Sequence, residues 1–200
     1  MMPAVFVKSY DAPPVSVKEI LRYAGAGDEN GQVRALAESC LAESESALRY
    51  SVCYAYFPIQ IEGEIIDLGF FKTDSASLRK NLAACEGVWV FAATVGLGQD
   101  RLIARYRSTA PSRALMLEAV GNERVEALCD LFCREIAEKE AAEGRKTHPR
   151  FSVGYGDLPL EGQKAIFAVL EPAKRIGLSL NESLLMTPQK SVTALIGVSK

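Results

Sequence analysis

The sequence predicts an α+β fold: one domain with a twisted antiparallel or mixed sheet and helices packed on it. Stretches whose apolar residues follow helical spacing alternate irregularly with short strand-like stretches, and their order is neither a strand–helix–strand repeat nor all strand. With 200 residues, of which 48% are hydrophobic, the chain is long enough for one sizeable core. We therefore expect residues 1–87 to supply N-terminal helices and strands to the same domain as residues 88–200.

The composition argues against two classes of partner. Charged residues make up 24% of the chain and the formal net charge is −2, whereas a nucleic-acid-binding protein usually carries a clustered basic excess. No apolar stretch approaches the length that spans a bilayer, and Pro3 and Lys8 interrupt the N-terminus, so no secretory signal is expected. The five cysteines form no CxxC pair, which favours free thiols in a reducing compartment. We expect a cytoplasmic protein that binds neither nucleic acid nor membrane.

Helical and strand-like patterns follow one another in the first half of the chain. Ser16 and Glu19 fit a capping box, and glycines within residues 25–27 are expected to end the short helix that begins there. The other expected elements are a helix over 30–47, strands over 51–56 and 64–71, a helix begun at Asp74 or Ser75 and ending near Cys85, and a buried apolar strand over 88–93.

Glycine and proline divide the second half. Gly96 and Gly98 form a turn after the buried strand, Gly121 is expected to interrupt a long helix, and Pro172 is expected to stop another. The expected elements are helices over 100–106 and 112–143, a loop over 146–157, a helix from Pro159 to Leu170, and strands over 176–198 around a turn at Thr187 and Pro188.

Three patterns resemble functional motifs but have simpler explanations. Cys129 and Cys133 lie one helical turn apart, yet the further ligands of a zinc site are missing, so we expect buried structural thiols. His148 lies in a polar loop without a nucleophile motif, and we expect it to be exposed. Gly96 and Gly98 stand where a dinucleotide-binding fingerprint would, but its third glycine is missing, so a tight strand-to-helix turn is expected.

The loop over 150–155 is the most informative segment. Arg150 offers a planar guanidinium that can bind a carboxylate through two hydrogen bonds. Gly154 lets a ligand approach the backbone, and Tyr155 adds a flat ring with one hydrogen-bonding tip. These features suit a nucleoside that bears an amino acid. An arginine and a tyrosine that only hold a surface turn would give the same pattern, so the residues alone leave both interpretations open.

Together with its surroundings, the pattern Arg150-x-x-x-Gly154-Tyr155 resembles the activation (or reactivation) domain of cobalamin-dependent methionine synthase. The resemblance covers residues 88–198, within the second part of the chain (88–200), and residues 1–87 match less clearly. The other matching segments, in the family's order, are 90–96 with Asp100, 125–128, 156–159, 175–178, 180–183 and Met186-x-Pro188-x-x-Ser191-Val192.

This resemblance implies an activity. In the family, methionine synthase carries a cobalamin (vitamin B12) that is occasionally oxidised to an inactive Co(II) form. The activation domain presents S-adenosylmethionine, and its methyl group, with one electron from flavodoxin or a similar donor, restores methylcobalamin. The resemblance therefore implies an accessory subunit of this methyltransferase in methionine biosynthesis, and leaves open whether the chain is itself an enzyme.

The resemblance also implies site residues. Arg150 would pair with the methionyl carboxylate, backbone groups at Ser152 and Gly154 would contact the ligand, and Tyr155 would lie near the reacting methyl group. Glu126 would lie near the ligand's ammonium or sulfonium, where an opposite charge is favourable, and a solvated helix face is the alternative. Neither a catalytic residue nor a metal ligand is expected on this chain.

The chain departs from the family at both ends. The family's N-terminal acidic contact has two candidates, Asp11 and Asp28, and the family uses tyrosines past the position of Lys200. No cobalamin-binding module or Asp-x-His-x-x-Gly run is present. We therefore expect a stand-alone reactivation subunit that acts in trans on a cobalamin-dependent methionine synthase or another corrinoid protein, which holds the cobalamin.

Two other functions are weighed against this one. The chain could be a non-catalytic interaction partner of a corrinoid protein that has lost S-adenosylmethionine binding. An independent methyltransferase acting on a small molecule ranks last, because no general base stands out in the sequence.

Overall fold

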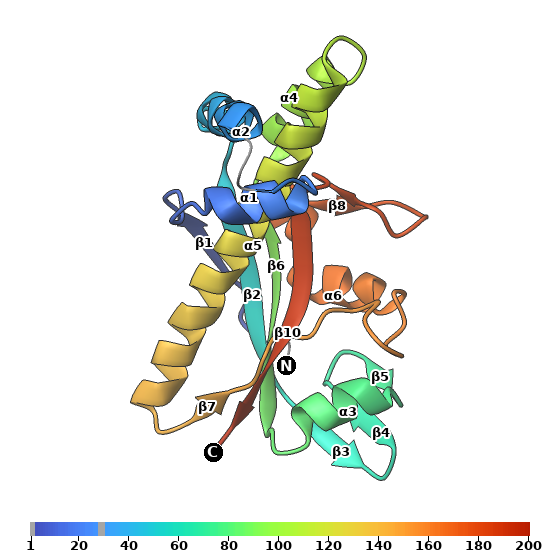
Figure 1. Cartoon of the computed structure of the whole chain (residues 1–200). Helices are drawn as coiled ribbons and strands as arrows, with labels where there is room; N and C mark the ends of the chain where they lie inside the picture. The colour runs from blue at the N-terminus through green and yellow to red at the C-terminus, as the bar shows by residue number, and fades with distance from the viewer. Residues whose placement is uncertain (1–2, 28–30) are drawn as a thin grey trace.

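A five-stranded sheet forms the centre of the molecule (Figure 1). The structure is a computed structural model that describes residues 3–27 and 31–200. The strand order is β1-β2-β6-β10-β7, and every neighbouring pair is antiparallel, which confirms the α+β fold. The strands are β1 (Phe6–Tyr10), β2 (Tyr50–Pro58), β6 (Gly87–Thr94), β7 (Lys146–Thr147) and β10 (Ser191–Ser199).

β6 is the middle strand, and all 8 of its residues are buried. Successive side chains of a strand point to opposite faces of the sheet. Trp89 and Phe91 pack in one apolar cluster, whereas Val88 and Val90 pack in the cluster on the other face. A strand that is covered on both faces needs an apolar residue at every position, which explains the continuous apolar run over 88–93.

Helices cover both faces of the sheet. On one face lies α5 (Pro111–Ala142), whose Leu128 and Phe132 belong to the same cluster as Phe91. The other face is covered by α3 (Ala76–Leu82), α6 (Gly162–Leu170) and α7 (Pro172–Ile176).

Three further helices surround the N-terminal part of α5, beyond one end of the sheet (Figure 1). They are α1 (Val17–Tyr23), α2 (Gly31–Ser44) and α4 (Leu97–Tyr106). The second expected helix begins at Asn30, which lies outside the described residues. Within residues 3–27 and 31–200, no helix combines the length and apolar character needed to cross a membrane.

Two small sheets lie outside the central one. The strand expected over 64–71 is wrong in detail, because the segment turns where Asp67 Oδ1 accepts the N–H of Gly69 at 2.8 Å. The small sheets consist of β3 (Gln60–Glu62), β4 (Ile65–Asp67) and β5 (Lys72–Thr73), and of β8 (Ser179–Leu180) and β9 (Met186–Thr187).

The expected interruption of the long helix is also wrong, because α5 is continuous through Gly121. A Cβ at this position would lie 2.8 Å from Cγ of Lys190, so glycine here permits close packing and does not bend the helix. Pro172 does more than stop α6, since it is also the first residue of α7. Its fixed φ angle suits that position.

The turn at Gly96 and Gly98 has the tight geometry that the sequence predicts. Gly96 has a φ of +85°, and a Cβ on Gly98 would lie 2.2 Å from the carbonyl oxygen of Ala47. The turn therefore connects an antiparallel strand to α4 through close backbone packing, without the parallel sheet of a dinucleotide-binding fold.

The segment before α1 is held by the middle of α5. As expected, Ser16 caps α1, and its Oγ accepts the N–H of Glu19 at 3.3 Å. The reciprocal bond comes from another helix, because Glu123 Oε1 accepts the N–H of Ser16 at 2.9 Å. Arg124, which is 1% exposed, pairs with Glu123 and donates to the carbonyl oxygen of Pro13 at 2.7 Å.

Candidate functional site

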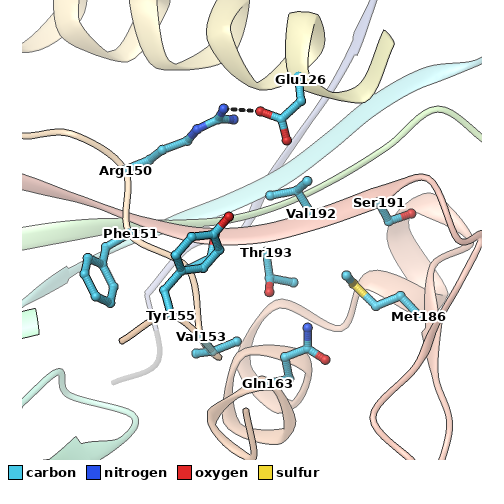
Figure 2. A pocket seen from close by; sticks show the side chains of 11 residues that line it. Glu126, Arg150, Phe151, Val153, Tyr155, Gln163, Met186, Ser191, Val192 and Thr193 are labelled. Carbon is cyan, nitrogen blue, oxygen red and sulfur yellow. Dashed lines mark hydrogen bonds and ion pairs between the residues drawn. The ribbon is translucent and has the colours of Figure 1, made fainter. Parts of the chain in front are cut away.

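A cavity of about 360 Å³ lies between the middle of α5, the loop over 150–155, the start of α6 and strand β10 (Figure 2). Four residues singled out from the sequence line it: Glu126, Arg150, Ser152 and Tyr155. The other lining residues are Phe151, Val153, Gln163, Met186, Ser191, Val192 and Thr193.

Arg150 pairs with two acidic residues of α5. Its Nη2 donates to Glu126 Oε2, the contact drawn as a dashed line in Figure 2, and lies 3.3 Å from Asp130 Oδ1. Its Nη1 is buried and has no hydrogen-bond partner among the residues that the structure describes. A buried N–H without a partner costs free energy. An anionic group that accepted a hydrogen bond from Nη1 would remove this cost.

Tyr155 forms part of the cavity wall while its side chain stays open to solvent. It is 70% exposed, which is unusual for so large an apolar surface. Ser152 is half-buried and lines the same cavity. An exposed aromatic ring beside a cavity can contact both a bound ligand and a second protein.

Gly154 is not among the lining residues, and it shapes the turn that carries Tyr155. It has a φ of +85°, and a Cβ there would lie 3.1 Å from Cδ1 of Leu160. Its N–H donates to the carbonyl oxygen of Leu158 at 2.9 Å. An L-residue with a side chain rarely adopts this backbone conformation, so glycine suits the turn.

A neighbouring acid fixes this loop to α3. Asp157 accepts hydrogen bonds from the hydroxyl of Ser75 at 2.5 Å and from the N–H groups of Ala76 at 2.7 Å and Ser77 at 3.1 Å. These bonds, led by the one from Ser75, hold the pKa of the Asp157 carboxyl well below its usual range. Asp157 thus attaches the cavity loop to the start of α3.

Sequence reasoning did not name two of the lining residues, Gln163 and Thr193, and it named Met186 only as part of a family motif. A signal for Gln163 does exist: it shares a face of α6 with the buried residues Ile166 and Leu170, because positions three and seven apart lie on one side of a helix. A polar residue in such an apolar stripe indicates either a buried hydrogen bond or a site.

The thiols and the histidine lie apart from the cavity lining. Cys129 is buried and Cys133 is partly buried, and burial raises the pKa of Cys133 to about 11, so it stays protonated at neutral pH. His148 is half-buried and not exposed as expected, because it packs beside β10, where its Nε2 lies 3.1 Å from Ser199 Oγ.

The N-terminal acidic candidates do not line the cavity in the described part of the chain. Asp11 is exposed and absent from the lining, and Asp28 lies outside the described residues. Glu19 of α1 lines a neighbouring cavity, which shares Glu126 with the first.

Comparison with known proteins assigns the domain to a family. A family model described as the vitamin B12 dependent methionine synthase activation domain matches residues 74–200, more than half of the chain. The chain belongs to this family. The match includes the whole cavity lining and begins before residue 88, where the resemblance becomes clear in the sequence.

A solved structure shares the fold of this activation-domain family member. It is a crystal structure of the MetH reactivation domain bound to AdoHcy, with a TM-score of 0.66 and 16% sequence identity. The similarity covers 98% of this chain and 78% of the other. No curated protein matches the chain. The structural similarity extends to the N-terminal segment, which the family model leaves out.

Proposed function

We propose that this protein binds S-adenosylmethionine and acts in trans as a reactivation subunit of a cobalamin-dependent methionine synthase. Its role would be the reductive methylation of inactive cob(II)alamin to methylcobalamin. The observation that carries the proposal is the buried Nη1 of Arg150, which has no partner in the described part of the chain, at the cavity that Glu126 also lines. The AdoHcy of the similar crystal structure, the demethylated form of S-adenosylmethionine, supports this ligand class.

The charges on the cavity wall suit the ends of this ligand. Arg150 binds the methionyl carboxylate, with Nη1 as its free donor. Glu126 faces the ammonium or the sulfonium, and Ser152 and Gly154 contribute backbone groups. Binding therefore loosens the Arg150–Glu126 pair, since each side chain gains an oppositely charged group of the ligand.

The exposed side chain of Tyr155 supports a reactive face at the opening of the cavity. The ligand supplies an activated methyl group, and the partner's cobalamin, which we expect a separate protein to hold, accepts it. This chain binds and orients the donor and excludes water at the contact face. A flavodoxin-like protein supplies the electron. The five free cysteines support a cytoplasmic location.

Isothermal titration with S-adenosylmethionine tests ligand binding. Arg150→Ala should weaken binding by about 2–3 kcal/mol, the range for a lost hydrogen-bonded charge pair. Arg113→Ala is a matched control, because Arg113 is 23% exposed in its side chain against 25% for Arg150 and pairs with Glu43 away from the cavity. Equal affinity in the two variants would contradict the role of Arg150.

Association with a corrinoid protein distinguishes a reactivation subunit from a non-catalytic interaction partner. The proposal predicts that S-adenosylmethionine strengthens this association, because the ligand and the partner meet at one face. Tight association that is indifferent to S-adenosylmethionine, in a protein that shows no binding by titration, would instead favour a non-catalytic interaction partner.

A further inference from the structure

The cavity has a polar group at the end opposite its charged wall. Gln163 lines the cavity although it is buried, with 5% exposure. Figure 2 shows it across the cavity from Arg150 and Glu126, with its amide nitrogen directed toward Thr193. Thr193 is 2% exposed and lines the same cavity.

The amide of Gln163 has unused hydrogen-bonding capacity. Its Oε1 is buried and finds no partner in the described ranges of the chain. A buried amide oxygen without a partner among the described residues stabilises the empty protein less than an apolar group would. A ligand group that satisfies the amide would remove this cost.

A primary amide presents one donor and one acceptor side by side. Its natural complement is the edge of an adenine base, where an amino group lies next to a ring nitrogen, and glutamine pairs with that edge through two hydrogen bonds. A carboxylate offers acceptors alone and an ammonium offers donors alone, so the charged ends of the ligand suit Arg150 and Glu126 better.

We infer that Gln163, assisted by the hydroxyl of Thr193, binds the adenine base and selects an adenosyl ligand. The inference rests on the proposed function, and it adds an assignment for the part of the cavity across from Arg150 (Figure 2). The ligand then spans the cavity, with its amino acid at α5 and its base at the start of α6. Gln163 is thus a specificity-determining residue.

Titration of Gln163→Leu with S-adenosylhomocysteine tests the contact. The dissociation constant should rise about tenfold or more, as expected for two lost neutral hydrogen bonds. The melting temperature of the free variant should stay equal or increase, because the buried amide oxygen that lacks a partner in the described chain is removed. A purely structural role would lower both affinity and melting temperature, and unchanged affinity would overturn the inference.

The matched control is Gln99→Leu. Gln99 is 0% exposed and also has a buried Oε1 without a partner among the described residues, but it lies on α4 and outside the cavity lining. Because its Nε2 donates to the carbonyl oxygen of Leu117 at 2.8 Å, this variant should lose stability and keep its affinity.

An analogue of S-adenosylhomocysteine with unsubstituted purine, which lacks the amino group, tests the adenine assignment. Removal of the amino group should weaken binding to the wild type about fivefold and to Gln163→Leu hardly at all, because the two changes remove the same contact. An equal loss in both proteins would overturn the assignment. No binding of S-adenosylhomocysteine or S-adenosylmethionine to the wild type would instead refute the proposed function, and the inference with it.

Discussion

Glu126 and Arg150 form an ion pair at one wall of the cavity. Glu126 offers a negative charge to a ligand, and Arg150 offers hydrogen-bond donors. Glu126 is 38% exposed in its side chain, whereas Asp130, the second acid near Arg150, is 66% exposed. A more exposed carboxylate is better screened by water and contributes less to binding a cation. The two acids should therefore differ in their effect on the ligand.

Glu126→Gln should weaken S-adenosylmethionine binding about tenfold, because it removes the negative charge and keeps the shape of the side chain. Asp130→Asn should change the affinity less than threefold, as expected for an exposed pair. Titration calorimetry measures both. Equal losses in the two variants would mean that Glu126 has no special position toward the ligand's positive charge.

Sequence reasoning named Arg150 and Tyr155 from their own chemistry and Glu126 from the family resemblance, and the three residues lie at one cavity. Their roles toward a ligand stay predictions. Gln163 was missed, because its proposed role in binding depends on burial and on its position near Thr193, which is distant in the chain. Gly154 was named as a ligand contact, and the contact stays a prediction.

At the scale of elements, the cavity loop depends on its attachment to α3. Asp157 accepts three hydrogen bonds from residues 75–77, and a carboxylate satisfies all of them better than an amide does. Because the folded-state pKa of Asp157 is lowered, its contribution to stability is present above the ordinary carboxyl pKa of about 4 and is lost as the pH falls below that value.

Asp157→Asn should therefore lower the melting temperature at neutral pH and reduce the loss of stability on acidification. It should also weaken S-adenosylmethionine binding, because the loop that carries Arg150 and Tyr155 is less firmly held. Asp67→Asn is the control, since hydrogen bonding to Gly69 also lowers the pKa of Asp67, at a turn away from the cavity. A ligand affinity that responds equally to both variants would refute the positioning role.

Element prediction depended on whether the deciding interactions are local. The N-cap of α1 at Ser16 and the buried strand β6 follow from neighbouring residues and were predicted. The continuity of α5 at Gly121 depends on Lys190, which the sequence places far away. β1 was not predicted, because it is an edge strand whose Phe6 and Val7 remain exposed and show no apolar alternation.

At the scale of the whole molecule, residues before the family match complete the sheet. β2 pairs with the whole length of β6, from Ser51 opposite Thr94 to Pro58 opposite Gly87. Without β2, the middle strand would expose its backbone groups and one edge of its apolar side chains. The α+β class was predictable from the patterns, but this pairing joins segments too far apart for the sequence to reveal.

A fragment of residues 74–200 should therefore fail to fold, although it contains the entire family match. Circular dichroism should show loss of the cooperative thermal transition that the full chain displays. A fragment that melts cooperatively and binds S-adenosylmethionine would show that β1, β2 and the first two helices are dispensable to the core.

Electron paramagnetic resonance of cob(II)alamin on a methionine synthase without its own activation domain tests most directly whether this chain restores a cobalamin held by another protein. With this chain, S-adenosylmethionine and a reduced flavodoxin-like donor, the Co(II) signal should disappear and methylcobalamin should form, and Arg150→Ala should slow this conversion. A Co(II) signal that persists with all components present would contradict the account.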